Sequence, residues 1–150
     1  MKQVYLETIL LIERLHRRFL DVVKSELDRL KVEDINNVQT LILYNIGGDQ
    51  LTVGELTNRG YYLGTNVSYN VKHLVQTGYL IQEKAPHDKR STRVKLSEKG
   101  TALVEKMDAL IERNVADLDK RSPGLAFLTE ANKSMHNLER FWTEYMTRLY

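Results

Sequence analysis

The stretch that decides the fold is Tyr79–Gly100, with the sequence YLIQEKAPHDKRSTRVKLSEKG. Residues 79–84 and 92–96 alternate apolar and polar side chains, which is the pattern of half-buried β-strands. A polar loop, residues 85–91, lies between them and contains Pro86. The pattern predicts a β-hairpin with a long, charged tip.

Helices are predicted on the N-terminal side of this hairpin. Their expected ranges are residues 4–30, 34–46, 53–60 and 65–77. Thr52 and Glu55 have the spacing of a capping box, in which each side chain accepts a hydrogen bond from the backbone amide of the other residue. Gly78 ends the last of these helices, because glycine adopts the left-handed conformation without a steric penalty.

Two more helices are predicted on the C-terminal side. Ser97 is the expected N-cap of the first, which runs to about Arg121. Ser122 is the expected N-cap of the second, with Pro123 as its first helical residue. This last helix has apolar residues at alternating steps of three and four, the a/d pattern of a coiled coil, namely Leu128, Ala131, Met135, Leu138, Trp142, Tyr145 and Leu149. A helix this apolar needs a partner, either its own domain or a second subunit.

The order helix, helix, turn, helix, hairpin is that of a winged helix-turn-helix, a mainly α fold with a small β-hairpin wing. In this fold one helix lies in the major groove of DNA and the hairpin tip reaches an adjacent minor groove. At about 100° per residue, helix 65–77 turns an apolar side toward the core, made of Val67, Val71, Leu74 and Val75. The opposite side holds Thr65, Tyr69, Lys72, His73 and Gln76, with Asn66 and Ser68 on its flanks. It contains no carboxylate, whereas a merely solvated helix face usually mixes acids with bases, so the pattern favours DNA.

The hairpin tip carries two adjacent cations, Lys89 and Arg90, preceded by Asp88. A planar guanidinium fits a narrow, electronegative minor groove. Asp88 is placed to hold either the Arg90 side chain or the loop itself. The alternative interpretation is a solvated charged turn. The tripeptide indicates DNA binding only because it follows the predicted helices and strand.

Composition excludes several classes of protein. The chain has 150 residues and a formal charge of +2, and it lacks cysteine, which removes disulfides and thiol chemistry. The four histidines are scattered, and no nucleophile elbow or phosphate loop is present, so we expect neither a metal site nor an enzyme. Residues 59–100 hold eight basic and three acidic residues, a charge of +5, whereas the rest of the chain holds 14 and 17. The small net charge therefore averages a basic module with mildly acidic helices.

A family resemblance follows from these motifs. Residues 37–100 resemble the MarR family of bacterial transcription regulators. Gln39 occupies the position of the family's usual glutamine, and residues 51–57, LTVGELT, resemble its L-T-x-x-E-L-A segment. Residues 88–90, DKR, and 94–100, VKLSEKG, resemble its D-x-R and V-x-L-T-x-K-G signature, which is the most specific part.

The resemblance implies a homodimer with interlocking N- and C-terminal helices that binds a pseudo-palindromic DNA operator. Residues 1–33 and 100–150 would form the helical dimerisation region, and residues 34–99 the winged helix-turn-helix. Carried over by position, the DNA-binding residues are Thr65, Asn66, Ser68, Tyr69 and Lys72 in the helix, with Lys89 and Arg90 in the wing. Arg90 matches the minor-groove arginine and Asp88 the acid that steadies it. Tyr69 stands where an arginine is common in the family. Its ring can stack on a sugar or contact a thymine methyl group, or its hydroxyl can bond a phosphate, and the sequence does not choose among the three.

We therefore expect a cytoplasmic, ligand-responsive repressor without a cofactor and without a membrane span. The sequence does not indicate the identity or the site of a small-molecule effector. Some aromatic residues can line an effector-binding cleft, but aromatic residues at helical spacing are more often part of the core. These residues are Tyr5, Phe19, Phe127 and Trp142. The alternative function is a winged-helix protein-interaction module that does not bind specific DNA.

Overall fold

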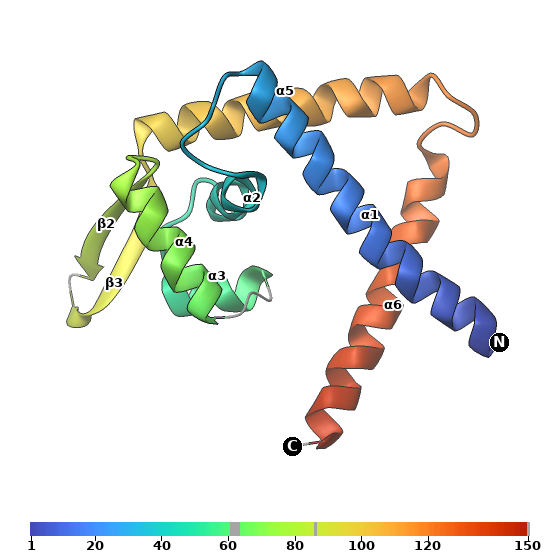
Figure 1. The fold of residues 1–150 in the computed structure, drawn as a ribbon. Coiled ribbons are helices and arrows are strands. Elements are labelled where there is room, and N and C mark those ends of the chain that lie inside the picture. The colour runs from blue at the N-terminus through green and yellow to red at the C-terminus, as the bar shows by residue number, and fades with distance from the viewer. Residues whose placement is uncertain (61–63, 86, 150) are drawn as a thin grey trace. The chain divides into compact units, whose positions relative to one another are not determined.

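The computed structural model describes residues 1–60, 64–85 and 87–149, although the side chains of Thr65 and Lys89 are outside the described part. The elements are shown in Figure 1 and run in the order α1 (Lys2–Arg29), α2 (Asn37–Ile46), β1 (Leu51–Thr52), α3 (Val53–Gly60), α4 (Gly64–Gln76), β2 (Leu80–Ala85), β3 (Asp88–Leu96), α5 (Glu98–Asp119) and α6 (Ala126–Leu149). The predicted mainly α fold with a small wing is confirmed. The chain forms two compact units, Met1–Asp108 and Ala109–Tyr150. The division into a dimerisation region and a DNA-binding domain at residues 33 and 100 stays a prediction.

Two capping boxes start helices in the first unit. At α3, the Glu55 carboxylate accepts from the Thr52 amide at 2.7 Å and the Thr52 hydroxyl accepts from the Glu55 amide at 3.1 Å, which confirms the prediction. At α2, Asn36 and Gln39 exchange the same pair of bonds at 2.8 and 3.0 Å. Helix α2 therefore begins at Asn37, later than the predicted start at residue 34.

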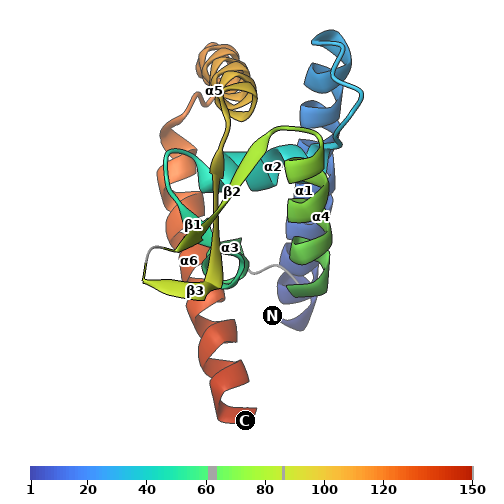
Figure 2. The same cartoon turned by 90° about the vertical axis from the view of Figure 1, so that its left-hand side faces the viewer.

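The wing is part of a three-stranded antiparallel sheet with strand order β1-β3-β2, shown in Figure 2. Leu51 of β1 pairs with Val94, and Leu80 pairs with Leu96. The predicted hairpin is confirmed, but two details were wrong. A short strand, β1, adds a third member, and both hairpin strands extend into the predicted loop, because Ala85 belongs to β2 and residues 88–91 belong to β3.

The core of the first unit lies between α2, α3, α4 and the sheet, which pack against one another. Its most buried side chains come from all of these elements, namely Ile42, Leu43, Ile46, Leu56, Val67, Leu74 and Val94. Of the four core residues predicted for α4, Val67, Val71 and Leu74 are buried, whereas Val75 is half-buried. Burial of this stripe is the main force that holds α4 in place.

The N-cap of α5 was predicted correctly, whereas that of α6 was not. The Ser97 hydroxyl accepts from the Gly100 amide at 3.0 Å. Helix α6 starts at Ala126, and residues 120–125 form turns, so Ser122 does not cap it. Gly124 has a φ of 75°, outside the right-handed helical region, so a helix that begins at Pro123 cannot continue through it.

Helices α1 and α6 each carry an exposed apolar face within the single chain. On α1 it includes Leu6, Leu10, Leu15 and Phe19, and on α6 it includes Phe127, Met135, Phe141 and Tyr145. No residue of α6 is buried among those described, and Tyr5 and Phe19 on α1 are exposed. The expectation that Tyr5, Phe19, Phe127 and Trp142 are core residues is therefore wrong for the isolated chain. Among the described residues, no helix is both long and apolar enough to cross a membrane.

Candidate nucleic-acid interface

Helix α4 has one buried face and one exposed face, as its sequence predicts. Val67, Val71 and Leu74 are 1%, 4% and 0% exposed. The exposed side chains are Asn66, Ser68, Tyr69, Lys72 and Gln76. Of the helical residues predicted to bind DNA, only the Thr65 side chain lies outside the described part of the chain. The four described ones share a face that has no acidic residue.

Tyr69 is the most exposed large side chain of this face, at 70%. Its hydroxyl makes no hydrogen bond among the residues that the structure describes. An aromatic ring held in water on a rigid helix is available for stacking, for apolar contact or for a hydrogen bond through its tip. The geometry leaves all three predicted contacts open.

His73 does not belong to the exposed face. The helical angle predicted that it does, and this prediction is wrong. Its Nε2 lies 2.9 Å from the backbone carbonyl oxygen of Asp34, and the side chain is half-buried. The last turn of α4 packs against the segment between α1 and α2, so this position faces protein instead of solvent.

A cluster around Asp34 fixes the C-terminal end of α4. The Asp34 carboxylate accepts a hydrogen bond from the Tyr79 hydroxyl at 2.7 Å and from the Lys99 ammonium at 2.8 Å. The ammonium also donates to the Thr77 carbonyl at 2.9 Å and lies 4.2 Å from the centre of the Tyr79 ring. Burial raises the pKa of Asp34, but the bonds from Lys99 and Tyr79 outweigh it, and the pKa of this carboxyl is held below its ordinary value. The carboxylate thus ties the segment between α1 and α2 to Tyr79, just before β2, and to Lys99 of α5, which in turn bonds the Thr77 carbonyl just after α4.

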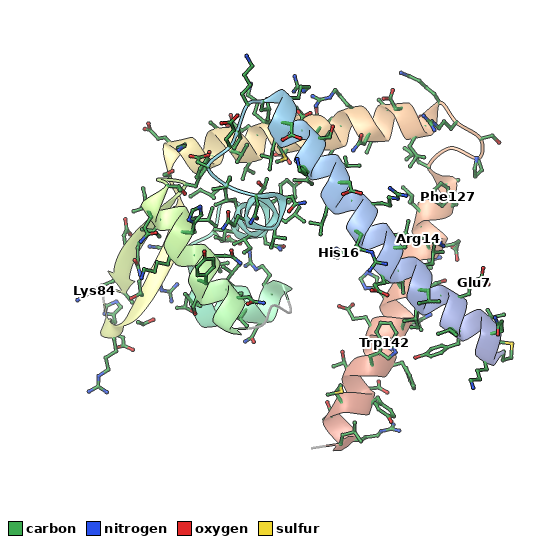
Figure 3. The ribbon with its side chains drawn as sticks, in the orientation of Figure 1. Glu7, Arg14, His16, Lys84, Phe127 and Trp142 are labelled. Carbon is green, nitrogen blue, oxygen red and sulfur yellow. The ribbon has the colours of Figure 1, made fainter. Side chains whose placement is uncertain are left out.

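The wing tip shows how Asp88 acts. Its carboxylate accepts a hydrogen bond from the backbone amide of Arg90 at 2.9 Å. The sequence left open whether Asp88 holds the Arg90 side chain or the loop backbone, and in the structure it holds the backbone. The Arg90 side chain is exposed, and that of Lys89 is outside the described part. Figure 3 shows Lys84 at the outer end of the neighbouring strand β2, where it adds another exposed cation.

At the base of the wing, basic side chains pair with acidic side chains of the same chain. Lys95 pairs with Glu83 at 2.9 Å, and Gln50 donates to the same carboxylate at 2.9 Å. The bond and the charge of Lys95 hold the pKa of Glu83 below its ordinary value. Arg59 at the end of α3 likewise pairs with Asp49 at 2.7 Å. Lys95 and Arg59 are therefore engaged within the protein, whereas Arg90 and Lys84 are exposed to solvent.

The sequence analysis missed Asn70, a half-buried residue on the flank of α4. The side-chain amide nitrogen of Gln39 donates to the side-chain oxygen Oδ1 of Asn70 at 3.1 Å. The spacing of Asn36 and Gln39 is itself a capping-box signal. The contact from α2 to α4 spans 31 positions, and no local pattern predicts it.

Described residues of the first unit line cavities on α1 and on the wing. One of about 500 Å³ is lined by Arg14, Arg17, Arg18, Leu20, Asp21 and Asn37, on α1 and the start of α2. The other, of about 490 Å³, lies on the wing and is lined by Gln50, Ala85, His87, Asp88, Ser91 and Arg93. Among the described residues no cluster of His, Asp and Glu is arranged to hold a metal ion.

Comparison with known proteins gives consistent matches. The sequence profile described as MarR family matches residues 33–91. The chain is 39% identical to the exopolysaccharide II synthesis transcriptional activator ExpG of Rhizobium meliloti (strain 1021) over 143 residues, which is 92% of this chain and 71% of that protein.

Solved structures share the fold. Staphylococcus aureus MarR in complex with salicylate and kanamycin is 20% identical, with a TM-score of 0.77 over 95% of this chain and 94% of that one. A mutant of E. coli MarR complexed with operator DNA is 23% identical, with a TM-score of 0.66 over 83% of this chain and 90% of that one.

Proposed function

The chain belongs to the MarR family of transcription regulators, and on this premise we propose that it binds a pseudo-palindromic operator as a homodimer. Helix α4 enters the major groove and the wing enters the adjacent minor groove. The observation that carries the proposal is the exposed face of α4, where Asn66, Ser68, Tyr69 and Lys72 stand opposite a buried apolar stripe without an acid among them.

Charge supports the same orientation. The +5 of residues 59–100 attracts phosphates, and in a dimer that charge is doubled. Arg90 at the wing tip is the cation proposed for the minor groove, with Asp88 fixing the backbone that carries it. Lys89 is proposed to add to the charge of the tip.

The exposed apolar faces of α1 and α6 support dimerisation. Monomeric soluble proteins rarely expose large contiguous apolar patches. Phe141 and Tyr145 on α6 are 51% and 54% exposed in the single chain, and Leu10 and Leu15 on α1 are 52% and 55% exposed. A second copy of the chain covers these faces in the proposed dimer.

The sign of regulation is a separate question. The sequence analysis expects a repressor, whereas the name of the rhizobial relative favours an activator. Both signs use the same contacts with DNA, because the sign depends on where the operator lies relative to the promoter. Transcription from an operator-bearing reporter, measured with and without the protein, distinguishes them.

We also propose that a small aromatic carboxylate is the effector and that it binds the cavity on α1 and α2. Three arginines line this cavity, and Arg14 lies on the α1 surface in Figure 3. Arginine recognises carboxylates through paired hydrogen bonds. The related S. aureus structure contains salicylate, which is the probe of choice. Salicylate is expected to change operator affinity, and Arg14→Ala to remove this response.

Selection of bound DNA from a random pool tests the main proposal. We expect enrichment of an inverted repeat whose half-sites are about one helical turn apart. Binding should weaken steeply with salt, with a log–log slope of about −0.9 per phosphate contact. A pool without enrichment, together with weak binding that is the same for all sequences, would instead support the protein-interaction module.

A further inference from the structure

We infer that Gln39 is a positioning residue that orients the side-chain amide of Asn70, so that α4 presents a hydrogen-bond donor to the operator at this position. The inference rests on the proposed function and adds a pair of residues to it. Gln39 is buried, with 4% of its surface exposed, and belongs to α2. Asn70 is half-buried on α4, beside the exposed face that carries Tyr69 and Lys72.

The first step is that the Gln39 amide has only one orientation. Its carbonyl oxygen accepts from the backbone amide of Asn36 at 3.0 Å. A backbone N–H can only donate, so the oxygen, not the nitrogen, must occupy that position. The Gln39 nitrogen is therefore directed to the other side, where it meets Asn70 at 3.1 Å.

The second step carries the same logic to Asn70. The Gln39 nitrogen can only donate, so the atom that faces it must be the Asn70 carbonyl oxygen. The Asn70 nitrogen then points away from Gln39 with its two N–H groups. In the hydrogen bonds of the described residues, this nitrogen has no partner. The capping box of α2 thus determines that α4 offers a donor here.

The orientation of the amide determines which contact Asn70 can add to recognition. The Asn70 oxygen already accepts one hydrogen bond from Gln39, and its second lone pair can accept another. The nitrogen that Gln39 directs away from itself can donate to a phosphate oxygen or to an acceptor atom on a base edge. These partners share one chemistry, and binding experiments distinguish them.

The test compares operator affinities of Asn70→Ala, Gln39→Met and the double variant. Methionine keeps the length and burial of Gln39 but removes both hydrogen bonds. Each single variant is expected to bind roughly tenfold more weakly, the effect of one hydrogen bond to a charged or base acceptor. The double variant should bind no more weakly than the weaker single one, because Gln39 acts through Asn70. Losses that multiply in the double variant would overturn the inference.

Asn36→Ala is the matched control. It removes the side chain that accepts from the Gln39 backbone amide at 2.8 Å, and it leaves the Asn36 backbone amide that orients the Gln39 side chain. The variant should melt at a lower temperature and bind the operator like the wild type. An affinity loss as large as that of Gln39→Met would mean that the stability of α2, not the orientation of the amide, is responsible.

Further readouts identify the acceptor and separate the two proposals. With a phosphate partner, Asn70→Ala weakens binding to all operators equally, and with a base partner it relaxes preference at one base pair. Asn70 is half-buried on a helix, so Asn70→Ala is expected to fold even where Gln39→Met does not. The operator affinity of Asn70→Ala then tests the inference by itself. If the wild type selects no DNA sequence, the proposed function fails. If the wild type selects an operator that Asn70→Ala binds equally well, this inference alone fails.

Discussion

Replacing Asp34 by alanine tests the argument that one carboxylate holds Tyr79 and Lys99 next to the end of α4. The substitution leaves the Tyr79 hydroxyl without its acceptor, and Tyr79 is only 3% exposed. An unpaired buried donor costs about 1–3 kcal/mol. The Lys99 ammonium loses an ion pair in which the two side chains are 49% and 42% exposed, worth about 0–1 kcal/mol. We expect a total of about 2 kcal/mol, which lowers the melting temperature of a chain of this size by about 4–8 °C.

Thermal unfolding followed by circular dichroism measures this loss, and Tyr79→Phe supplies the control. Phenylalanine removes the hydroxyl together with its need for an acceptor. In that background Asp34→Ala should cost less than about 1 kcal/mol, since only the exposed ion pair is lost. An Asp34→Ala cost that is equal in both backgrounds would refute the assignment of most of the energy to the Tyr79 bond.

The pH dependence of stability is a second test of the Asp34 cluster. The pKa of Asp34 lies below its ordinary value of 3.8 in the folded protein, so the unfolded chain binds its proton first as the pH falls. The contribution of Asp34 is therefore complete well above pH 3.8 and is lost as the pH drops through the lower, folded pKa. Burial and the Asp34 carboxylate raise the pKa of Tyr79, which keeps its hydroxyl protonated as the donor. The difference in stability between wild type and Asp34→Ala should stay constant near neutrality and shrink only in acid.

Three other variants test the remaining assignments. Arg90→Ala should weaken operator binding by about 1–3 kcal/mol in a titration while sedimentation shows an unchanged dimer, and unchanged affinity would remove Arg90 from the minor groove. Phe141→Glu on the apolar face of α6 should give monomers at micromolar concentration with the helical content retained, whereas Thr143→Glu on its polar face should not. Gly100→Ala places a Cβ 2.2 Å from the Tyr79 carbonyl oxygen and should lower stability by about 1–3 kcal/mol in urea, and a wild-type midpoint would contradict this close approach.

Local signals account for what the sequence predicted correctly. The helical period of residues 65–77, the Thr52–Glu55 box and the Ser97 cap each involve residues at most four positions apart. Such signals act before any tertiary contact forms, so they can be read from the chain directly.

Long-range contacts account for what it missed. Strand β1 has only two residues and exists because Leu51 pairs with Val94. His73 is drawn out of the exposed face by Asp34, 39 positions earlier. Similarly, the amide of Asn70 is oriented by a residue of a different helix. None of these contacts has a period or a spacing, so they are visible only once the elements have packed.

The motif that carries most of the family resemblance, VKLSEKG at residues 94–100, does not lie on the proposed DNA-facing surface. Val94 is fully buried and pairs with both neighbouring strands, and Ser97 caps α5. Lys99 completes the Asp34 cluster, and Gly100 allows α5 to approach the Tyr79 backbone. Val94 holds the three strands together, whereas Ser97, Lys99 and Gly100 fix the start of α5, so the motif specifies how the fold is assembled. The exposed face of α4, in contrast, departs from the family at Tyr69, and it follows that family membership predicts the scaffold while the operator sequence must be found by measuring what this face binds.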